Sequence, residues 1–331
     1  MLTFEGLRGL VSPILLLDAG PSIEDQVAET IRRTGRWNGP GPEAAELFAG
    51  TRLDVTYEQA LEQAQTFAPD LVVCDSCDYV GPTVAAAIGA AWVMHGIAGA
   101  LPPSFVAAME HRWAGQLRKR GLRARPRLGY IAPYPDPGEA PDIDRLPMRY
   151  TAFDLPDAIY NPPRFNDTTL PRVLLTLGSS VNDPDLAARL ARSLAEAALN
   201  VMVTDAAPTD TAVNPRIRHL GFVPLARLLP DVDLVVSAGG TGTVLSALAA
   251  ALPLVILPRL ADQPLNAARA TRAGAVLTID AAAEAGATAH KILTTPSYGL
   301  AARQARNDIS AQPAPANLLA QLLARIPASA A

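Results

Sequence analysis

The sequence predicts an α/β protein built from parallel sheets in two domains. Short apolar runs bounded by glycine, proline or aspartate alternate with stretches of helical length, which is the pattern of parallel strands joined by crossover helices. The chain has 331 residues, about twice the length of a common single domain. A proline-rich stretch at residues 133–171 lacks any sustained period and separates the two series of runs, as a linker would.

The expected elements follow one another along both halves of the chain. Strands are predicted at residues 71–74, 91–94, 172–176, 201–204, 234–237 and 254–257. Helices are predicted at residues 25–33, 57–66, 184–198, 243–251, 264–273 and 314–325. We place the boundary inside the linker, with an N-terminal domain at residues 1–150 and a C-terminal domain at residues 151–331. The last helix is a candidate to return to the N-terminal domain.

Composition and charge exclude several classes of function. Apolar residues make up 49% of the chain and charged residues 18%, which excludes a disordered, solvated chain. The net charge of -4 provides no positive field for a phosphate backbone, so nucleic acid is not an expected partner. Arginine and alanine are abundant and only Lys119 and Lys291 are lysines, a composition that indicates a GC-rich bacterial genome.

The two cysteines form a CxxC pair, Cys74 and Cys77, and are too few to staple a chain of this length. We therefore expect a reducing compartment. A redox or zinc role would need a helix N-terminus or two further ligands, and neither is visible in the sequence. The favoured interpretation is that two small side chains close a buried strand, with no metal ion bound.

Two long apolar segments, at residues 79–108 and 234–258, have the length of a membrane span. Glycines and prolines interrupt both, so buried strands, loops and helices explain them better. The apolar run at residues 11–17 is interrupted by Pro13 and flanked by acids, which makes it a poor signal peptide. We expect a cytoplasmic protein without a transmembrane segment.

A glycine-rich loop follows the strand expected at residues 234–237 and leads into a helix. It reads Ala238-Gly239-Gly240-Thr241-Gly242-Thr243. Glycines let the backbone approach a ligand, and free amide groups at a helix start favour an anion. The loop therefore predicts a phosphate site, to which the two threonine hydroxyls add donors. It is not a dinucleotide fingerprint, because Leu245 stands where the third glycine should be, and no Walker lysine follows.

An acid and an amide, Asp262 and Gln263, end the loop after the strand expected at residues 254–257. This is the carboxyl edge of the predicted sheet, where open α/β sheets bind ligands. Adjacent carboxylate and amide groups can share hydrogen bonds among the vicinal hydroxyls of a sugar. The alternative is that Asp262 only caps the helix that follows.

Taken together, these motifs resemble the nucleotide-sugar signature of the family 1 glycosyltransferases, particularly the bacterial enzymes that decorate antibiotic aglycones in secondary metabolism. The resemblance is dense after Arg172 and sparse before Pro69. The segments that carry it are GFVP at 221–224, GGTGT at 239–243, Pro253, Pro258, ADQPLNA at 261–267, VLLTLGSS at 173–180, the strand, loop and helix at 69–96, and GLRGLVSP at 6–13.

The resemblance implies the GT-B architecture, in which two facing Rossmann-like domains hold the donor in the C-terminal domain and the acceptor in the N-terminal one. It implies inverting transfer of a sugar or deoxysugar from a dTDP- or UDP-linked donor to a natural-product acceptor, without a cofactor or metal ion. The residues it implies are Phe222 and Val223 beside the base, Ser179, Ser180, Gly239, Gly240, Thr241, Gly242 and Thr243 on the diphosphate, and Asp262 and Gln263 on the sugar.

The chain departs from the family pattern at two positions. Leu10 stands where the first loop of the family has its general-base histidine, and Ala238 stands where the donor loop has a histidine on the diphosphate. Asp75 matches the remaining partner of the His–Asp pair. His95 ends a predicted strand on the carboxyl edge and is the histidine placed to act as the base. The alternative for His95 is a hydrogen bond to the backbone at the strand end.

The N-terminal half is short for this architecture. Few residues separate Leu10 from Pro69, and the Gly-Pro repeat at residues 39–42 cannot lie inside a strand or helix. We infer a shortened N-terminal domain that lacks at least one βα unit. Three functions remain open: a working transferase whose base is Asp75 or whose acceptor is acidic, such as a phenol; a catalytically silent homologue that serves a biosynthetic partner protein or forms a homodimer; and a GT-B pocket recruited to another tailoring reaction.

Overall fold

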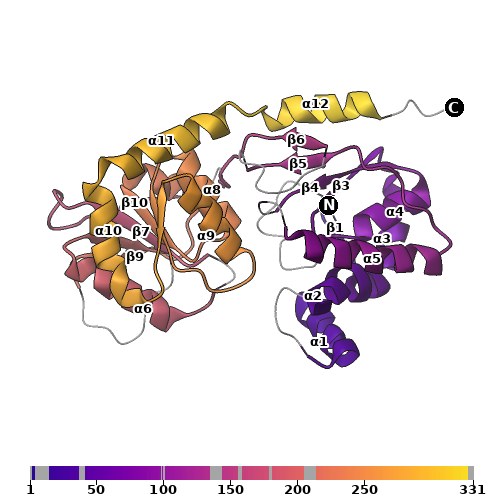
Figure 1. The fold of residues 1–331 in the computed structure, drawn as a ribbon, viewed down its shortest axis with the longest axis horizontal. Coiled ribbons are helices and arrows are strands. Elements are labelled where there is room, and N and C mark those ends of the chain that lie inside the picture. Colours follow the sequence, from indigo (N-terminus) through magenta and orange to yellow (C-terminus); the bar gives the residue numbers. More distant parts are fainter. Residues whose placement is uncertain are drawn as a thin grey trace. The chain divides into compact units, whose positions relative to one another are not determined.

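The computed structural model describes residues 2–3, 15–36, 42–97, 99, 101–134, 144–155, 159–178, 181–204 and 214–326. The chain divides into two compact units (Figure 1). We call Met1–Met148 with Pro313–Ala331 the N-terminal unit and Arg149–Gln312 the C-terminal unit. The division after Met148 falls close to the predicted boundary at residue 150, and the last helix belongs to the N-terminal unit.

The C-terminal unit contains a six-stranded parallel sheet. Its strands lie in the order β12-β11-β10-β7-β8-β9. This order starts at β7 in the middle and reverses direction between β7 and β10, as in a dinucleotide-binding fold, and ligands bind where that reversal occurs. The strands are β7 (Arg172–Thr176), β8 (Asn200–Val203), β9 (Ile217–His219), β10 (Leu234–Ser237), β11 (Leu254–Ile256) and β12 (Val276–Thr278).

Helices cover this sheet (Figure 1). Its apolar side chains are buried in a core cluster with residues of these helices. Val173 and Leu175 are fully buried and share one cluster with Leu190 and Leu194 of the helix after β7. That helix begins where the Asp183 carboxylate accepts the Leu186 amide at 2.9 Å. The helices are α6 (Pro184–Glu196), α7 (Leu225–Leu228), α8 (Thr241–Ala249), α9 (Gln263–Arg272), α10 (Ala285–Thr294) and α11 (Pro296–Ser310), with 3₁₀ turns at Leu229–Asp231 and Ala282–Glu284.

The N-terminal unit has a four-stranded parallel sheet in the order β3-β4-β5-β6 and a separate parallel pair, β1-β2. The strands are β1 (Leu2–Thr3), β2 (Leu17–Asp18), β3 (Leu71–Asp75), β4 (Ala91–His95), β5 (Tyr130–Ala132) and β6 (Arg145–Pro147). The helices are α1 (Ile23–Thr34), α2 (Pro42–Glu46), a π-helical turn η2 (Leu47–Thr51), α3 (Arg52–Phe67), α4 (Val80–Ile88), α5 (Pro103–Lys119) and α12 (Pro315–Arg325).

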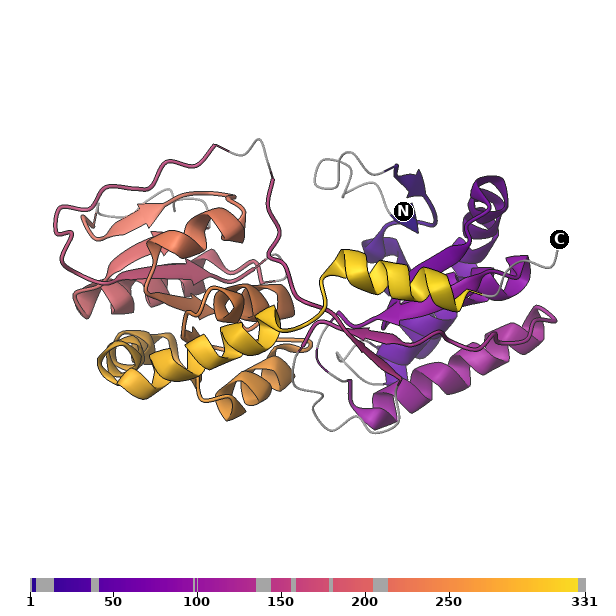
Figure 2. The same cartoon turned by 90° about the horizontal axis from the view of Figure 1, so that it is seen from above.

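Helix α12 lies on the N-terminal unit, although 164 residues of the other unit, 149–312, separate it from β6 in sequence (Figure 2). Its Leu318 and Leu322 are buried in a cluster with Val93, Ile131 and Leu146. The position of α12 therefore follows from apolar burial against the sheet of the N-terminal unit.

Every strand and helix predicted from the sequence is present, with shifts of a few residues at the ends. The linker predicted at residues 133–171, without a sustained period, contains one regular element, because β6 lies inside it and pairs with β5. A strand of three residues is too short to show a period. Between β2 and β3, the described residues form helices and no strand. Among the described residues, none of the helices combines the length and apolar character of a bilayer span.

Candidate functional site

The glycine loop connects β10 to α8 at the point where the strand order of the C-terminal unit reverses. Gly239 has φ +89, and a Cβ atom there would lie 2.7 Å from Ile256 Cγ2 of the neighbouring strand. Both its conformation and its close contact therefore require glycine. Helix α8 begins at Thr241 without a side-chain cap. The amide groups of its first turn remain available to an anion, as the sequence predicts.

A buried network ties this loop to the loop that follows β11. Thr241 Oγ1 donates to Asp262 Oδ2 at 2.7 Å. Asn266 Nδ2, from α9, lies 2.7 Å from the same carboxylate oxygen, 3.0 Å from Thr241 Oγ1 and 3.1 Å from the Gly239 carbonyl. Asn266 was not predicted as a site residue from the sequence. The available signal was its spacing of four residues from Asp262, which places both side chains on one face of a helix.

Gln263 is buried, and its amide oxygen is already engaged by the protein. Gln263 Oε1 accepts the backbone amides of Arg259 at 2.8 Å and Leu260 at 2.9 Å. These bonds hold the loop after β11 in shape. The side-chain oxygen of Gln263 therefore has a structural role in this loop, and only its amide nitrogen remains for a ligand.

The other predicted donor residues differ in how much surface they expose. Phe222 follows β9 with 71% of its surface exposed, so its ring is available for stacking, and Val223 is half-buried. Thr243 is half-buried, and its hydroxyl makes no hydrogen bond with the described residues. Ala238 is buried and packs in the core beside α6, so this position contributes no polar group. Ser179, Ser180 and Leu10 lie outside the described residues.

Tyr150, which was not predicted as a site residue from the sequence, supports the start of α8 from the segment that enters the C-terminal unit. Its hydroxyl donates to the Gly242 carbonyl at 3.0 Å and lies 2.9 Å from Ser246 Oγ. Because Tyr150 has one hydroxyl hydrogen, Ser246 is the donor in the second bond. Burial raises the pKa of Tyr150, which keeps this hydroxyl protonated at neutral pH.

In the N-terminal unit, the two predicted catalytic candidates end neighbouring strands. Asp75 of β3 and His95 of β4 are register partners in a parallel pair, so both lie at the same carboxyl edge of the sheet. Burial lowers the pKa of His95, while a backbone hydrogen bond with Gly96 and the charge of Asp75 oppose that shift. At neutral pH the imidazole is therefore uncharged, the form that accepts a proton.

The loop after β3 holds its carboxylates with backbone amides. Asp75 Oδ1 accepts the Cys77 amide at 2.6 Å, and Asp78 accepts the amides of Val80 at 2.9 Å and Gly81 at 3.2 Å. Burial and the nearby charge of Asp75 raise the pKa of Asp78 to about 6. Asp75 and Asp78 are therefore both positioned by the turn into α4.

The CxxC pair has no sign of redox chemistry. Cys74 and Cys77 are buried and form no disulfide. Burial raises the pKa of the Cys74 thiol, and its Sγ lies 3.5 Å from the Val93 carbonyl of the next strand. A reactive cysteine needs a lowered pKa, so the structure supports the packing role that the sequence favours.

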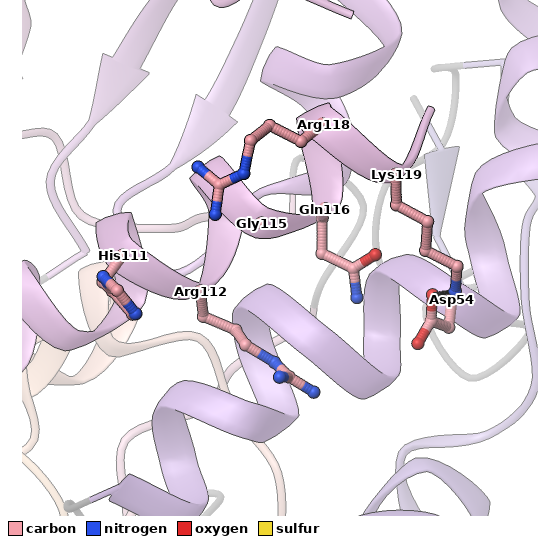
Figure 3. Close-up of a pocket in the computed structure, with 7 residues that line it drawn as sticks. All are labelled: Asp54, His111, Arg112, Gly115, Gln116, Arg118 and Lys119. Atoms are coloured by element: carbon pink, nitrogen blue, oxygen red, sulfur yellow. Dashed lines mark hydrogen bonds and ion pairs between the residues drawn. The ribbon is translucent and has the colours of Figure 1, made fainter. Parts of the chain in front are cut away.

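A hollow of about 370 Å³ lies on the outer helices of the N-terminal unit and involves none of the predicted site residues (Figure 3). Asp54 of α3 accepts hydrogen bonds from Lys119 Nζ of α5 at 3.0 Å and from Arg33 of α1 at 2.8 Å. Although burial opposes the shift, these cations hold the pKa of Asp54 well below its usual range. The ion pairs of Asp54 therefore link helix α3 to helices α1 and α5. Its lining residues are Asp54, His111, Arg112, Gly115, Gln116, Arg118 and Lys119.

Comparison with known sequences places the C-terminal unit in a described family. Residues 188–325 match the erythromycin biosynthesis protein CIII-like C-terminal domain. The elloramycin glycosyltransferase of Streptomyces olivaceus is 29% identical over 279 residues, which covers 80% of this chain and 71% of that protein. The L-demethylnoviosyl transferase of Streptomyces niveus is 30% identical over 222 residues, which covers 64% of this chain and 58% of that protein.

Comparison with solved structures covers both units. A glycosyltransferase of Streptomyces sp. SF2575, solved with thymidine diphosphate, aligns with a TM-score of 0.83 and 25% identity over 98% of this chain and 90% of that one. The chain has the GT-B fold, and its relatives in sequence and in structure are antibiotic glycosyltransferases. A glycosyltransferase from Streptomyces nogalater has the same fold, with a TM-score of 0.78 and 23% identity over 97% of this chain and 89% of that one.

These similarities confirm the resemblance to antibiotic glycosyltransferases and the two-domain GT-B architecture that the sequence predicts. The matched segment, residues 188–325, contains the glycine loop and the loop with Asp262 and Gln263, whereas Asp75 and His95 lie on the sheet of the N-terminal unit. The aligned region spans a little over half of the L-demethylnoviosyl transferase, at 58% of its length.

Proposed function

We propose that this protein transfers a sugar from a nucleoside diphosphate sugar to a natural-product acceptor with inversion at the anomeric carbon. One observation carries the proposal most directly. The uncapped glycine loop at the start of α8 is tied to the loop that bears Asp262 and Gln263, so an anion site and a polar sugar site form one surface of the C-terminal unit.

Several groups around this loop match the parts of such a donor. The first turn of α8 and the free Thr243 hydroxyl would bind the diphosphate, and the exposed ring of Phe222 would stack on the base. Asp262 and the amide nitrogen of Gln263 would bind sugar hydroxyls. Thymidine diphosphate is the nucleotide we favour, because the relative from Streptomyces sp. SF2575 was solved with it.

The absence of a histidine at position 238 leaves the developing charge on the diphosphate to other groups. Arg259 is exposed on the loop after β11, and its guanidinium makes no ion pair with the described residues. The Gln263 side chain fixes the Arg259 backbone amide. We therefore include Arg259 among the groups that stabilise the leaving diphosphate, together with the amide groups of α8.

Transfer to the acceptor requires a base that deprotonates its hydroxyl group and a single displacement at the anomeric carbon of the sugar. The neutral imidazole of His95 would take the proton of the acceptor hydroxyl, with the Asp75 carboxylate stabilising the imidazolium that forms. The acceptor oxygen then bonds to the anomeric carbon as the bond from that carbon to the diphosphate breaks. Because attack and departure occur on opposite faces, the configuration inverts. The names of the relatives, elloramycin glycosyltransferase among them, favour transfer over a silent homologue.

Calorimetric titration of the full chain with thymidine and uridine diphosphates tests the donor site. We expect binding of at least one of them at millimolar concentration or tighter. Gly240→Asp places a carboxylate where a Cβ meets no atom within 4 Å, so it should abolish binding by charge repulsion without steric damage. Gly115→Asp on α5 adds the same charge in the other unit and is the matched control. Failure of both nucleotides to bind the unmodified protein would refute the proposed function.

A further inference from the structure

We propose that Asn266 is a positioning residue that joins the phosphate loop and the sugar-contacting aspartate into one preformed donor site. This inference rests on the proposed function and deepens it. Asn266 is completely buried on α9, so it acts through its neighbours and touches no substrate itself.

The hydrogen bonds of Asn266 determine which way its amide points. The Gly239 carbonyl and the Asp262 carboxylate can only accept, at 3.1 and 2.7 Å, so the atom between them must be the amide nitrogen. Asn266 Oδ1 is buried without a hydrogen-bond partner. The protein therefore uses the donating end of this amide and leaves the accepting end unsatisfied, which shows that the two donated bonds dominate its placement.

These bonds decide what Thr241 and Asp262 can offer to a ligand. Thr241 donates its single hydroxyl hydrogen to Asp262 Oδ2 and lies 3.0 Å from Asn266 Nδ2. Asp262 Oδ2 thus accepts from two side chains before any ligand arrives, and Oδ1 is the carboxylate oxygen left for a sugar hydroxyl. The sequence prediction that Thr241 donates to phosphate changes accordingly: Thr241 orients Asp262, and Thr243 carries the free hydroxyl.

The same bonds connect two loops that leave adjacent strands, β10 and β11. The phosphate loop provides the Gly239 carbonyl and Thr241, and the other loop provides Asp262. A site whose loops are held in the bound geometry avoids the cost of ordering them on binding. Loss of Asn266 would release both loops together and should weaken nucleotide binding, even though the nucleotide does not contact this side chain.

A buried asparagine elsewhere in the same unit provides a matched control. Asn200 is also almost completely buried, and its Nδ2 donates to the carbonyls of Asp167 at 2.7 Å and Leu170 at 3.4 Å. Its Oδ1, like that of Asn266, has no hydrogen-bond partner. Asn200 links β8 to the segment before β7 and makes no hydrogen bond to either donor loop. It therefore represents a purely structural asparagine.

The experiment compares Asn266→Ala with Asn200→Ala in the full chain by thermal unfolding and by titration with thymidine diphosphate. We expect both variants to unfold at lower temperature, since each removes buried hydrogen bonds. Only Asn266→Ala should weaken nucleotide binding, by about 5- to 100-fold, the range that the loss of one or two such bonds implies. Equal nucleotide affinity in Asn266→Ala and the unmodified protein would overturn the inference. Failure of the unmodified protein to bind would overturn the proposed function, and this inference with it.

If Asn266→Ala does not fold, two substitutions that barely change side-chain size, Asn266→Asp and Asp262→Asn, test the same inference. Asn266→Asp places two carboxylates against each other and should also weaken binding. Combining it with Asp262→Asn restores one donor and one acceptor across the same contact, so the double variant should recover part of the lost affinity for thymidine diphosphate. A double variant that binds no better than Asn266→Asp would show that these loops are not coupled through this contact.

Discussion

Two positions lack the histidines expected from the family pattern, so the proposed chemistry falls to other residues. Position 238 holds a buried alanine that packs in the core, so in the proposed donor site backbone amides, hydroxyls and Arg259 would stabilise the diphosphate. On the acceptor side, His95 is the register partner of Asp75 at the carboxyl edge. The sequence identified His95 and Asp75 as separate candidates, and the parallel pairing of β3 and β4 brings them side by side.

Substituting His95 tests its role as the base. His95→Gln should lower kcat by about 10²- to 10⁴-fold, the usual contribution of a general base, and leave binding of thymidine diphosphate unchanged. Because burial lowers the pKa of His95, the base stays neutral to lower pH than an ordinary histidine, and the rate should fall only as pH drops below about 6.5. This acid limb should disappear in the variant, as measured by rate profiles against pH.

The matched control is His290→Gln, on the exposed side of α10, which should retain the full rate. A His95→Gln variant that remains fully active would exclude His95 as the base.

The shape of the proposed donor site depends on contacts between helices, strands and loops as well as on the glycine motif itself. The loop from β10 to α8 depends on one glycine for its path and on Asn266 and Tyr150 for its support. The strand, the glycines and the helix were predictable from spacing in the sequence. The two supports were not, because Tyr150 is 92 residues from the carbonyl it binds and Asn266 is 27 residues from Gly239.

Adjacent glycines in this loop should respond very differently to alanine. Gly239→Ala forces a side chain into positive φ and into contact with Ile256 Cγ2 at 2.7 Å. We expect a loss of roughly 2–5 kcal/mol in the free energy of unfolding, the sum of left-handed strain and overpacking. Gly240→Ala meets no atom within 4 Å and should change stability little. Urea unfolding measures both, and equal stability of the two variants would contradict the geometry.

Each of the two units has apolar clusters of its own among the described residues. The clusters of the N-terminal unit include residues from α12, which the chain adds only after it has completed the C-terminal unit. We expect calorimetric unfolding in two transitions. Thymidine diphosphate should raise the unfolding temperature of the C-terminal unit only. At a concentration one hundred times its dissociation constant, it should add about 2.7 kcal/mol to the free energy of unfolding of that unit. A shift of both transitions together would contradict independent stability.

Helix α12 offers a test of the unit boundary. Leu318→Ala with Leu322→Ala removes two buried side chains and should cost the N-terminal unit about 2–5 kcal/mol each, because cavities form against Val93 and its neighbours. Leu319 and Leu323 are half-exposed on the same helix, at 49% and 51%, and their alanine double variant is the control. Only the first pair should lower the N-terminal transition in calorimetry. An equal loss from both pairs would argue against the observed packing.

The sequence by itself determined the α/β class, the two halves, the order of the main strands and helices, the family resemblance and the phosphate loop. Each of these follows from local periodicity, glycine and proline placement, or short motifs read within one segment. Tertiary structure decided the return of α12, the pairing of Asp75 with His95, and the network in which Asn266 commits Thr241 to Asp262. Those outcomes depend on apolar burial and on hydrogen bonds between residues distant in the chain, and local sequence patterns do not record which distant partners meet.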